Sequence, residues 1–201
     1  MKVLVACEYS GAVRDAFLRR GHDAWSCDIE YTCDSPHNLM NGLGYRHQVQ
    51  DCMEMVWHKE WDLLIAHPPC TYLCNSGVRW LTHPDYPERW KDMIDGAVFF
   101  RDLLHMCTHI PKVCVENPIM HGYAKKIIGS TQTQIVQPWM FGEGETKATC
   151  LWLRGLDKLV PTDVVEGREQ RLHKLPPSED RWKLRSKTYQ GIAGAMASQW
   201  G

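Results

Sequence analysis

Short apolar runs alternate along the chain with longer segments of helical periodicity. Residues 2–6 (KVLVA) form a continuous β-branched run, which is typical of a strand buried on both faces. A helix is predicted over residues 12–20, because Val13, Ala16 and Phe17 share one face and Gly21 ends the pattern. Residues 24–27 form a second short strand. The chain therefore begins strand, helix, strand.

This alternation continues through the rest of the chain. Further strands are predicted at 61–66, 112–115, 133–136 and 149–153, the last two as a hairpin across 141–144, and further helices at 90–108 and 191–199. Residues 154–183 are rich in proline and charge, have no clear period and indicate an irregular excursion. Strands that alternate with helices imply crossover connections. We therefore expect an α/β fold with a mainly parallel sheet and helices on both faces.

Composition adds limits to this picture. A chain of 201 residues is long enough for one domain with a sizeable core, and 44% hydrophobic and 23% charged residues are usual for a folded protein. The 23 Lys and Arg against 24 Asp and Glu leave a net charge of −1, so a nucleic acid would have to be met by a local basic patch. No apolar run reaches membrane-spanning length and the first residues resemble no signal peptide, so we expect a soluble cytoplasmic protein with no membrane partner.

Nine cysteines are many for this length. Their number is odd, and they are scattered among predicted strands and helices. A disulfide framework belongs to small secreted domains. We expect reduced thiols that are mostly small buried hydrophobes.

Polar residues follow each of the first four predicted strands: Tyr9-Ser10-Gly11, Asp28, His67-Pro68-Pro69-Cys70 and Glu116-Asn117-Pro118. In open α/β sheets, ligands bind outside the carboxyl ends of the strands. Gly11 would let the backbone pass close to a ligand, although a tight turn would need a glycine equally well. Asp28 would accept hydrogen bonds from ribose hydroxyls or serve as a helix cap.

Cys70 and Glu116 carry the most specific chemistry. Two prolines hold the Cys70 thiol on a rigid turn, where it could act as a nucleophile. Glu116 would end the adjacent strand, and partial desolvation would let it hold a proton near neutral pH and donate it. Thiol and carboxylic acid together suggest attack on an electron-poor ring, and the alternative is two unrelated polar residues.

The order of the Gly11 turn, Asp28, Asp51, Pro68-Pro69-Cys70 and Glu116-Asn117 resembles the DNA (cytosine-5)-methyltransferase family over most of the chain. The resemblance implies a Rossmann-like fold that uses S-adenosylmethionine as cofactor and DNA as partner. It implies that Cys70 adds to cytosine C6, that Glu116 is the acid at N3 and that C5 is then methylated. Asp28 would bind the cofactor ribose and Asp51 the adenine amino group.

The same resemblance assigns further residues. Residues 188–193 resemble the last family motif, which returns to the cofactor. The implied cofactor-binding set is Cys7, Glu8, Tyr9, Ser10, Gly11, Asp28, Ile29, Asp51, Cys52, Pro68, Gly191 and Ile192. The implied substrate-binding set is Pro69, Asn117, Pro118, Lys147 and Arg79, of which Lys147 and Arg79 are also expected to assist catalysis.

Several features depart from the family pattern. Tyr9 stands where a glycine is usual, and the two expected arginines fall on Lys147 and Thr149. Lys147 keeps one charge, and Arg79 is predicted to substitute by closing over the substrate. In place of a separate target-recognition domain there is only a basic insertion, residues 154–185, as in short forms that look like those of bacteriophages. We therefore expect one catalytic domain over 1–201, in a bacterial or phage-infected cell. Its sequence specificity would be relaxed or supplied by a partner subunit. Its substrate would be duplex DNA, single-stranded DNA or a free cytosine nucleotide.

Three alternatives stay open at this stage. An amino-methyltransferase would need an aromatic residue where Cys70 stands. A zinc site of the deaminase kind from His67, Cys70 and Cys74 would need a Cys-x-x-Cys pair and a His-x-Glu, and neither spacing is present, so we expect no metal. A catalytically weak or inactive module would keep the fold and bind cofactor and DNA without turnover.

Overall fold

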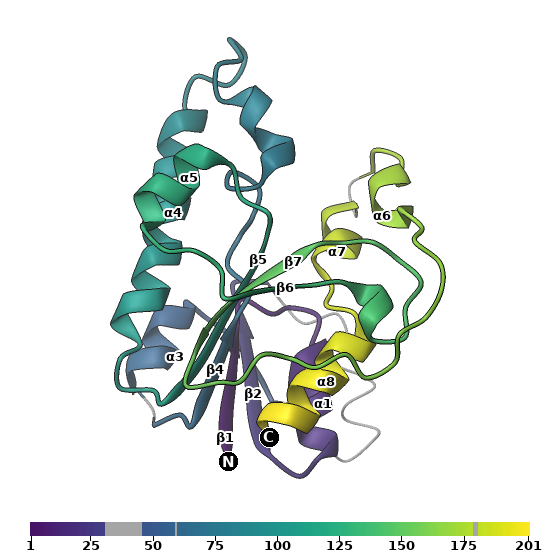
Figure 1. The fold of residues 1–201 in the computed structure, drawn as a ribbon. Helices are drawn as coiled ribbons and strands as arrows, with labels where there is room; N and C mark the ends of the chain where they lie inside the picture. The colour runs from purple at the N-terminus through teal and green to yellow at the C-terminus, as the bar shows by residue number, and fades with distance from the viewer. Residues whose placement is uncertain (31–45, 59, 179–180) are drawn as a thin grey trace.

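The computed structural model describes residues 1–30, 46–58, 60–178 and 181–201, and its central feature is a seven-stranded sheet (Figure 1). The order across the sheet is β3-β2-β1-β4-β5-β7-β6. The strands are β1 (Lys2–Ala6), β2 (Asp23–Asp28), β3 (His47–Val49), β4 (Leu63–Ala66), β5 (Lys112–Pro118), β6 (Gln134–Val136) and β7 (Thr149–Arg154). The first five run parallel, whereas β7 pairs antiparallel with both β5 and β6. The predicted mainly parallel α/β fold is confirmed.

Helices cover both faces of the sheet. Helices α1 (Ala12–Arg19) and α8 (Gln190–Trp200) share one core with Val3 and Val5 of β1, and α3 (Cys52–His58), α4 (Arg89–Met106) and α5 (Gly122–Ile128) share the other with Leu4 and Ala6. Alternate side chains of a strand point to opposite faces. Because both faces of β1 are covered, Val3 to Ala6 are all fully buried, which explains the unbroken apolar run of this strand.

The structure differs from the sequence-based prediction mainly in its short elements. Strand β3 and helices α3 and α5 carry no long periodic run, and the sequence pattern does not predict them. Strands β6 and β7 pair as expected, but residues 137–148 between them make a long connection that includes the 3-10 helix η2 (Pro138–Met140) instead of a tight turn. In the part of the chain that the structure describes, no helix is long and apolar enough to cross a membrane.

The insertion at 154–185 is also more ordered than its composition predicts. The short helix α6 (Arg171–Lys174) lies within it, and a second short helix, α7 (Arg181–Ser186), begins within it and ends one residue beyond it. Its loop runs beside the β6–β7 connection, with backbone bridges from Phe141 to Asp163 and from Glu145 to Glu169. The insertion therefore packs on the connection between β6 and β7.

Gly191 at the start of α8 is a position where a side chain has no room. A Cβ atom there would lie 1.7 Å from the Phe141 carbonyl oxygen and 2.7 Å from Glu143 Oε2, and the Gly191 N–H donates to Glu143 Oε1 at 2.8 Å. We expect Gly191→Ala to lower the free energy of unfolding by about 2–3 kcal/mol, because backbone must move to relieve the overlap. Urea unfolding measures this change.

Gly194, one turn further along α8, provides the control. It is exposed, and a Cβ atom there would meet no atom of the described residues within 4 Å. Gly194→Ala should therefore be neutral or stabilise by up to about 1 kcal/mol through helix propensity. Equal unfolding midpoints for the two variants would contradict the close approach of α8 to the β6–β7 connection.

Candidate active site at the carboxyl ends of the strands

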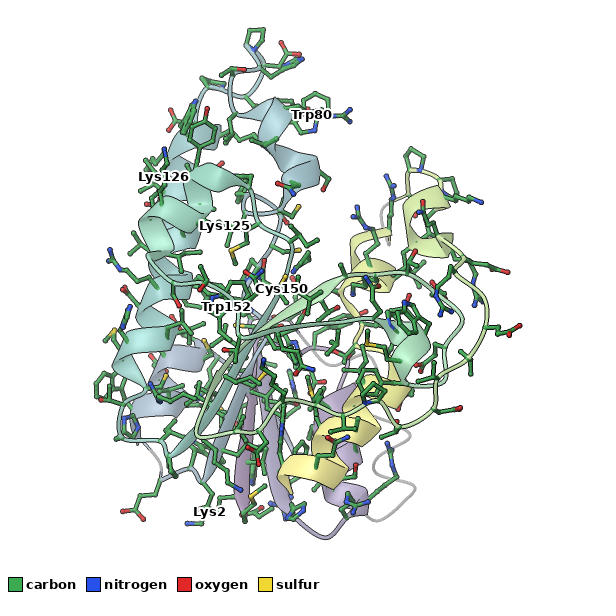
Figure 2. All side chains as sticks on the ribbon, viewed as in Figure 1. Lys2, Trp80, Lys125, Lys126, Cys150 and Trp152 are labelled. Carbon is green, nitrogen blue, oxygen red and sulfur yellow. The ribbon has the colours of Figure 1, made fainter. Side chains whose placement is uncertain are left out.

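The sequence-predicted polar residues lie at the carboxyl ends of strands, or just after them, and these strands are neighbours in the sheet. β2, β1, β4 and β5 are parallel and adjacent, so their carboxyl ends lie at one edge. On one side of this edge rises a lobe made of the 3-10 helix η1 (Asn75–Trp80) with α4 and α5, and on the other side lie α6 and α7 (Figure 1). Lys2, at the start of β1, marks the opposite edge in Figure 2.

The Pro68-Pro69-Cys70 turn is fixed by the neighbouring strand. The Asn117 side chain, which is buried in β5, donates from Nδ2 to the Pro68 carbonyl oxygen at 2.7 Å. The Cys70 carbonyl oxygen accepts from the Leu73 and Cys74 N–H groups, so the chain turns directly after the thiol. Pro69 is exposed and Pro68 is buried. The Asn117 side chain therefore holds the backbone of this turn, and this gives Cys70 a defined place beside β5.

The Cys70 thiol is protonated in the unliganded protein. Burial raises its pKa to about 11, and the charges of Cys74 and Glu116 act in the same direction. The positive charges of Lys147 and Arg185 oppose this shift. Sequence patterns do not single out Arg185, in α7, as a site residue, because only the folded chain brings the insertion back to the sheet.

Glu116 lies in β5, two residues before the end of the strand, and forms a pair with His67. Its Oε2 lies 2.9 Å from His67 Nδ1, and the two side chains are 16% and 9% exposed. Burial alone would raise the pKa of Glu116, but the His67 hydrogen bond and charge, together with Lys147, hold it below its ordinary value. The expectation that desolvation would keep Glu116 protonated near neutral pH is therefore wrong for the unliganded protein.

The structure brings Lys147 to this site but not Arg79. The Lys147 ammonium donates to the Arg185 carbonyl oxygen at 2.8 Å, and its charge acts on Cys70 and Glu116. Arg79 is exposed in η1, with its guanidinium 4.8 Å from the centre of the Trp80 ring. In Figure 2, Trp80 lies far from Cys150, the β7 residue that pairs with Asn117. Arg79 therefore lies away from the Cys70–Glu116 pair in this structure, and its closing over the substrate stays a prediction.

The first turn, after β1, is filled by its own side chains. Glu8 is buried and accepts from the N–H groups of Val13 at 2.7 Å and Arg14 at 3.2 Å, which caps α1. Tyr9 is also buried, and its hydroxyl donates to the Lys183 carbonyl oxygen at 3.3 Å. Gly11 has φ of +70°, as the turn requires. Glu8 therefore already uses N–H groups at the start of α1.

Two further predicted cofactor residues are neighbours. Cys7, with φ of +55°, places its sulfur 3.7 Å from that of Cys52. Ser10 is buried and lies near the Ala12 N–H, at 3.4 Å. These contacts are internal to the protein and link the first turn to the start of α3.

The ends of β2 and β3 present carboxylates and an apolar surface. Asp28 and Asp51 both act electrostatically on Cys27, and β2, which ends at Asp28, pairs with β3, which ends two residues before Asp51. Ile29 is 78% exposed beside Asp28. Burial raises the pKa of Asp28, although the Glu30 N–H, which donates to the Asp28 carboxylate at 3.0 Å, opposes the shift. This set fits an adenosine group, with carboxylates for its hydroxyl and amino groups and an apolar side chain for its ring.

The predicted last motif contacts the connection between β6 and β7. Gly191 is bonded to Glu143, and the Tyr189 hydroxyl donates to Glu145 Oε2 at 2.7 Å. Ile192 is 2% exposed and belongs to the core that α8 shares with α1. The packing thus uses Ile192 as a core residue.

In the described ranges, no group of three or more His, Cys, Asp or Glu side chains could hold a metal ion. His67 Nδ1 is bonded to Glu116, and the Cys74 sulfur lies 3.1 Å from the Ser76 hydroxyl. The geometry therefore does not gather His67, Cys70 and Cys74 into a zinc site.

Comparisons with known proteins bear on the fold. No family model and no curated protein matches this sequence. A protein described as a putative DNA modification methyltransferase encoded within an Escherichia coli prophage is 15% identical and has a TM-score of 0.50, over 88% of this chain and 55% of its own. A methyltransferase of Entamoeba histolytica, EhMeth, is 14% identical with a TM-score of 0.49, over 85% of this chain and 57% of its own. This chain thus spans little more than half the length of either protein.

The sheet order and the prophage-encoded neighbour together define the class of fold. The parallel strands, the helices on both faces and the antiparallel β7 make a Rossmann-like fold of the S-adenosylmethionine-dependent methyltransferase type.

Proposed function

We propose that this chain is a DNA (cytosine-5)-methyltransferase that transfers a methyl group from S-adenosylmethionine to C5 of cytosine. One observation carries the proposal: Cys70 follows β4, Glu116 lies near the carboxyl end of β5, the adjacent parallel strand, and the charge of Glu116 acts on the Cys70 thiol. A thiol and a carboxyl beside each other suit addition to a pyrimidine ring at C6 with a proton delivered at N3.

The reaction begins at Cys70. The thiol gives its proton to solvent and the thiolate adds to C6. The π electrons of C5=C6 and C4=N3 shift so that C4=C5 forms and C5 gains electron density, and N3 takes up a proton through the Glu116 carboxyl. Because the resting thiol has a pKa of about 11, the nearby charges of Lys147 and Arg185 are what favour the thiolate when the substrate enters. Once C5 carries the methyl group, the C5 proton passes to a solvent base, the Cys70 thiolate leaves C6 and N3 returns its proton, which restores the aromatic ring.

Asp28, Ile29 and Asp51 would hold the adenosine part of the cofactor. The Glu8 carboxylate caps α1 and therefore lies at the first turn, where the amino-acid part of the cofactor would approach. When bound, S-adenosylmethionine supplies an electrophilic methyl group.

The insertion is proposed to take the place of a target-recognition domain. Two residues of α7 support this. The charge of Arg185 acts on Cys70, and the Lys183 carbonyl oxygen accepts a hydrogen bond from the Tyr9 hydroxyl in the first turn. Such a small basic segment suits contacts to phosphates more than readout of a long sequence. We propose DNA, duplex or single-stranded, as the substrate, with specificity that is relaxed or supplied by a partner subunit.

A second candidate is a module that binds cofactor and DNA without turnover. Two observations favour it: Tyr9 and Glu8 fill the first turn, and the unliganded site holds a protonated thiol beside an ionised carboxylate. In this case the fold and the adenosine site would be kept and the chemistry lost.

Trapping distinguishes the two candidates. We expect the protein, incubated with S-adenosylmethionine and DNA that contains 5-fluorocytosine, to form a covalent adduct, because fluorine at C5 cannot leave as a proton would. The adduct is measured as a shifted band under denaturing conditions, and calorimetry measures cofactor binding. Cofactor binding without an adduct would support the binding module. If the protein shows no adduct and no cofactor binding, both candidates are overturned.

A further inference from the structure

His67 directly follows β4, and its side chain is 9% exposed. Nδ1 lies 2.9 Å from Glu116 Oε2. Nε2 is buried and has no hydrogen-bond partner in the described part of the chain. The imidazole therefore makes one hydrogen bond, and that bond is to the proposed acid.

Other buried histidines of this protein differ in this respect. His121 caps α5 by accepting from the Ala124 N–H, and its Nε2 lies 2.9 Å from the Tyr72 carbonyl oxygen. His47 also has partners on both ring nitrogens, Ser26 and the Glu30 carbonyl. A histidine with a purely structural role is usually satisfied in this way. His67 is not.

Three charged groups act on His67 from three elements. Glu116 comes from β5, Glu8 from the turn before α1 and Lys147 from the segment before β7. Burial lowers the pKa of His67, but the hydrogen bond to Glu116 and the charges of Glu116 and Glu8 outweigh it, so the pKa lies above 6.5. The His67–Glu116 pair therefore keeps its proton to a higher pH than a free imidazole would, as imidazolium and carboxylate.

We propose that His67 is a positioning residue that fixes the Glu116 carboxyl through Oε2, leaves Oε1 for the cytosine ring, and retains on the pair the proton that N3 takes up. This inference rests on the proposed function. The His67 imidazolium is then the source of the proton that N3 takes up through Glu116, which an ionised carboxylate alone could not supply.

Atoms and electrons balance in this step. The Cys70 S–H bond breaks with its proton going to solvent, and the bond from Sγ to C6 forms. The C5=C6 and C4=N3 π bonds break as C4=C5 forms, and N3 gains the proton of the pair. The pair is left as a neutral imidazole and a carboxylate.

The test is His67→Asn, because an asparagine amide can donate close to the Nδ1 position but does not titrate. Methyl transfer is measured as kcat against pH. In the wild-type protein activity falls as pH rises through the raised pKa of the pair. In His67→Asn the proton is held by Glu116 alone, so this alkaline fall should move down by at least about one pH unit, and turnover at pH 8 should drop about tenfold.

His121→Asn is the matched control, since it replaces another buried histidine and should keep the wild-type profile. A loss in His67→Asn that is equal at every pH, or an unchanged profile, would overturn the inference. NMR titration of the His67 ring in the unliganded wild-type protein gives a second readout, with an expected pKa above 6.5. A value below 6.5 would also overturn it.

The trapping experiment separates this inference from the proposed function. Absence of the 5-fluorocytosine adduct in the wild-type protein removes the proposed function, whatever His67 does. An adduct in the wild-type protein with an unchanged pH profile in His67→Asn removes only the role of His67.

Discussion

Replacing Cys70 by alanine should abolish methyl transfer, with turnover reduced at least about 10⁴-fold. The proposed reaction requires a covalent bond from the Cys70 sulfur to C6, and Cys70 is the thiol that the Pro68-Pro69-Cys70 turn places after β4. Serine should not rescue activity, because a hydroxyl ionises far less readily than a thiol. Transfer of a labelled methyl group to cytosine-containing DNA measures the loss, and calorimetry should show cofactor binding close to that of the wild-type protein.

Cys74→Ala provides the control for this prediction. Cys74 is the nearest cysteine in sequence, is partly buried like Cys70, and has its sulfur 3.1 Å from the Ser76 hydroxyl. Its variant should keep turnover within about twofold to threefold of the wild-type value. If Cys70→Ala remains active, the chemistry does not pass through a thiol adduct, and an amino-methyltransferase becomes the better interpretation.

The parts of the fold that the sequence predicts are those with strong, continuous patterns. The apolar runs of β1, β4 and β5 and the long periodic segment of α4 are recognisable, because burial on both faces or on one helical face leaves a clear signature. Strand β3 has only three residues, two of them polar, and exists because it pairs with β2. Tertiary pairing of this kind leaves no local pattern to find.

The same distinction applies to the site. Cys70 and Glu116 stand in recognisable motifs, and the adjacency of β4 and β5 brings them together. The sequence does not predict His67 and Arg185 as catalytic helpers, since their roles depend on one hydrogen bond and on where α7 folds back. The predicted protonation state of Glu116 is wrong for the same reason. The burial of Glu116 can be inferred from the sequence, but the hydrogen bond and charge of His67, which outweigh that burial together with Lys147, cannot.

Glu116→Gln should lower turnover about 10²- to 10⁴-fold while leaving cofactor affinity unchanged. Glutamine keeps the size of the side chain, and its amide oxygen can still accept the Nδ1–H of His67. Its amide can also donate to N3, but it cannot transfer a proton there, so the cytosine would bind without the ring being activated for addition. Single-turnover methyl transfer separates this chemical step from binding.

Glu54→Gln, an exposed change of the same kind in α3, should keep the wild-type turnover and serves as the control. The comparison with His67→Asn is informative, because that variant keeps a titratable carboxyl whereas Glu116→Gln removes it. Glu116→Gln should therefore be inactive across the whole pH range, and His67→Asn should recover toward acid pH. A larger loss of cofactor affinity than of turnover in Glu116→Gln would instead place Glu116 in the cofactor site.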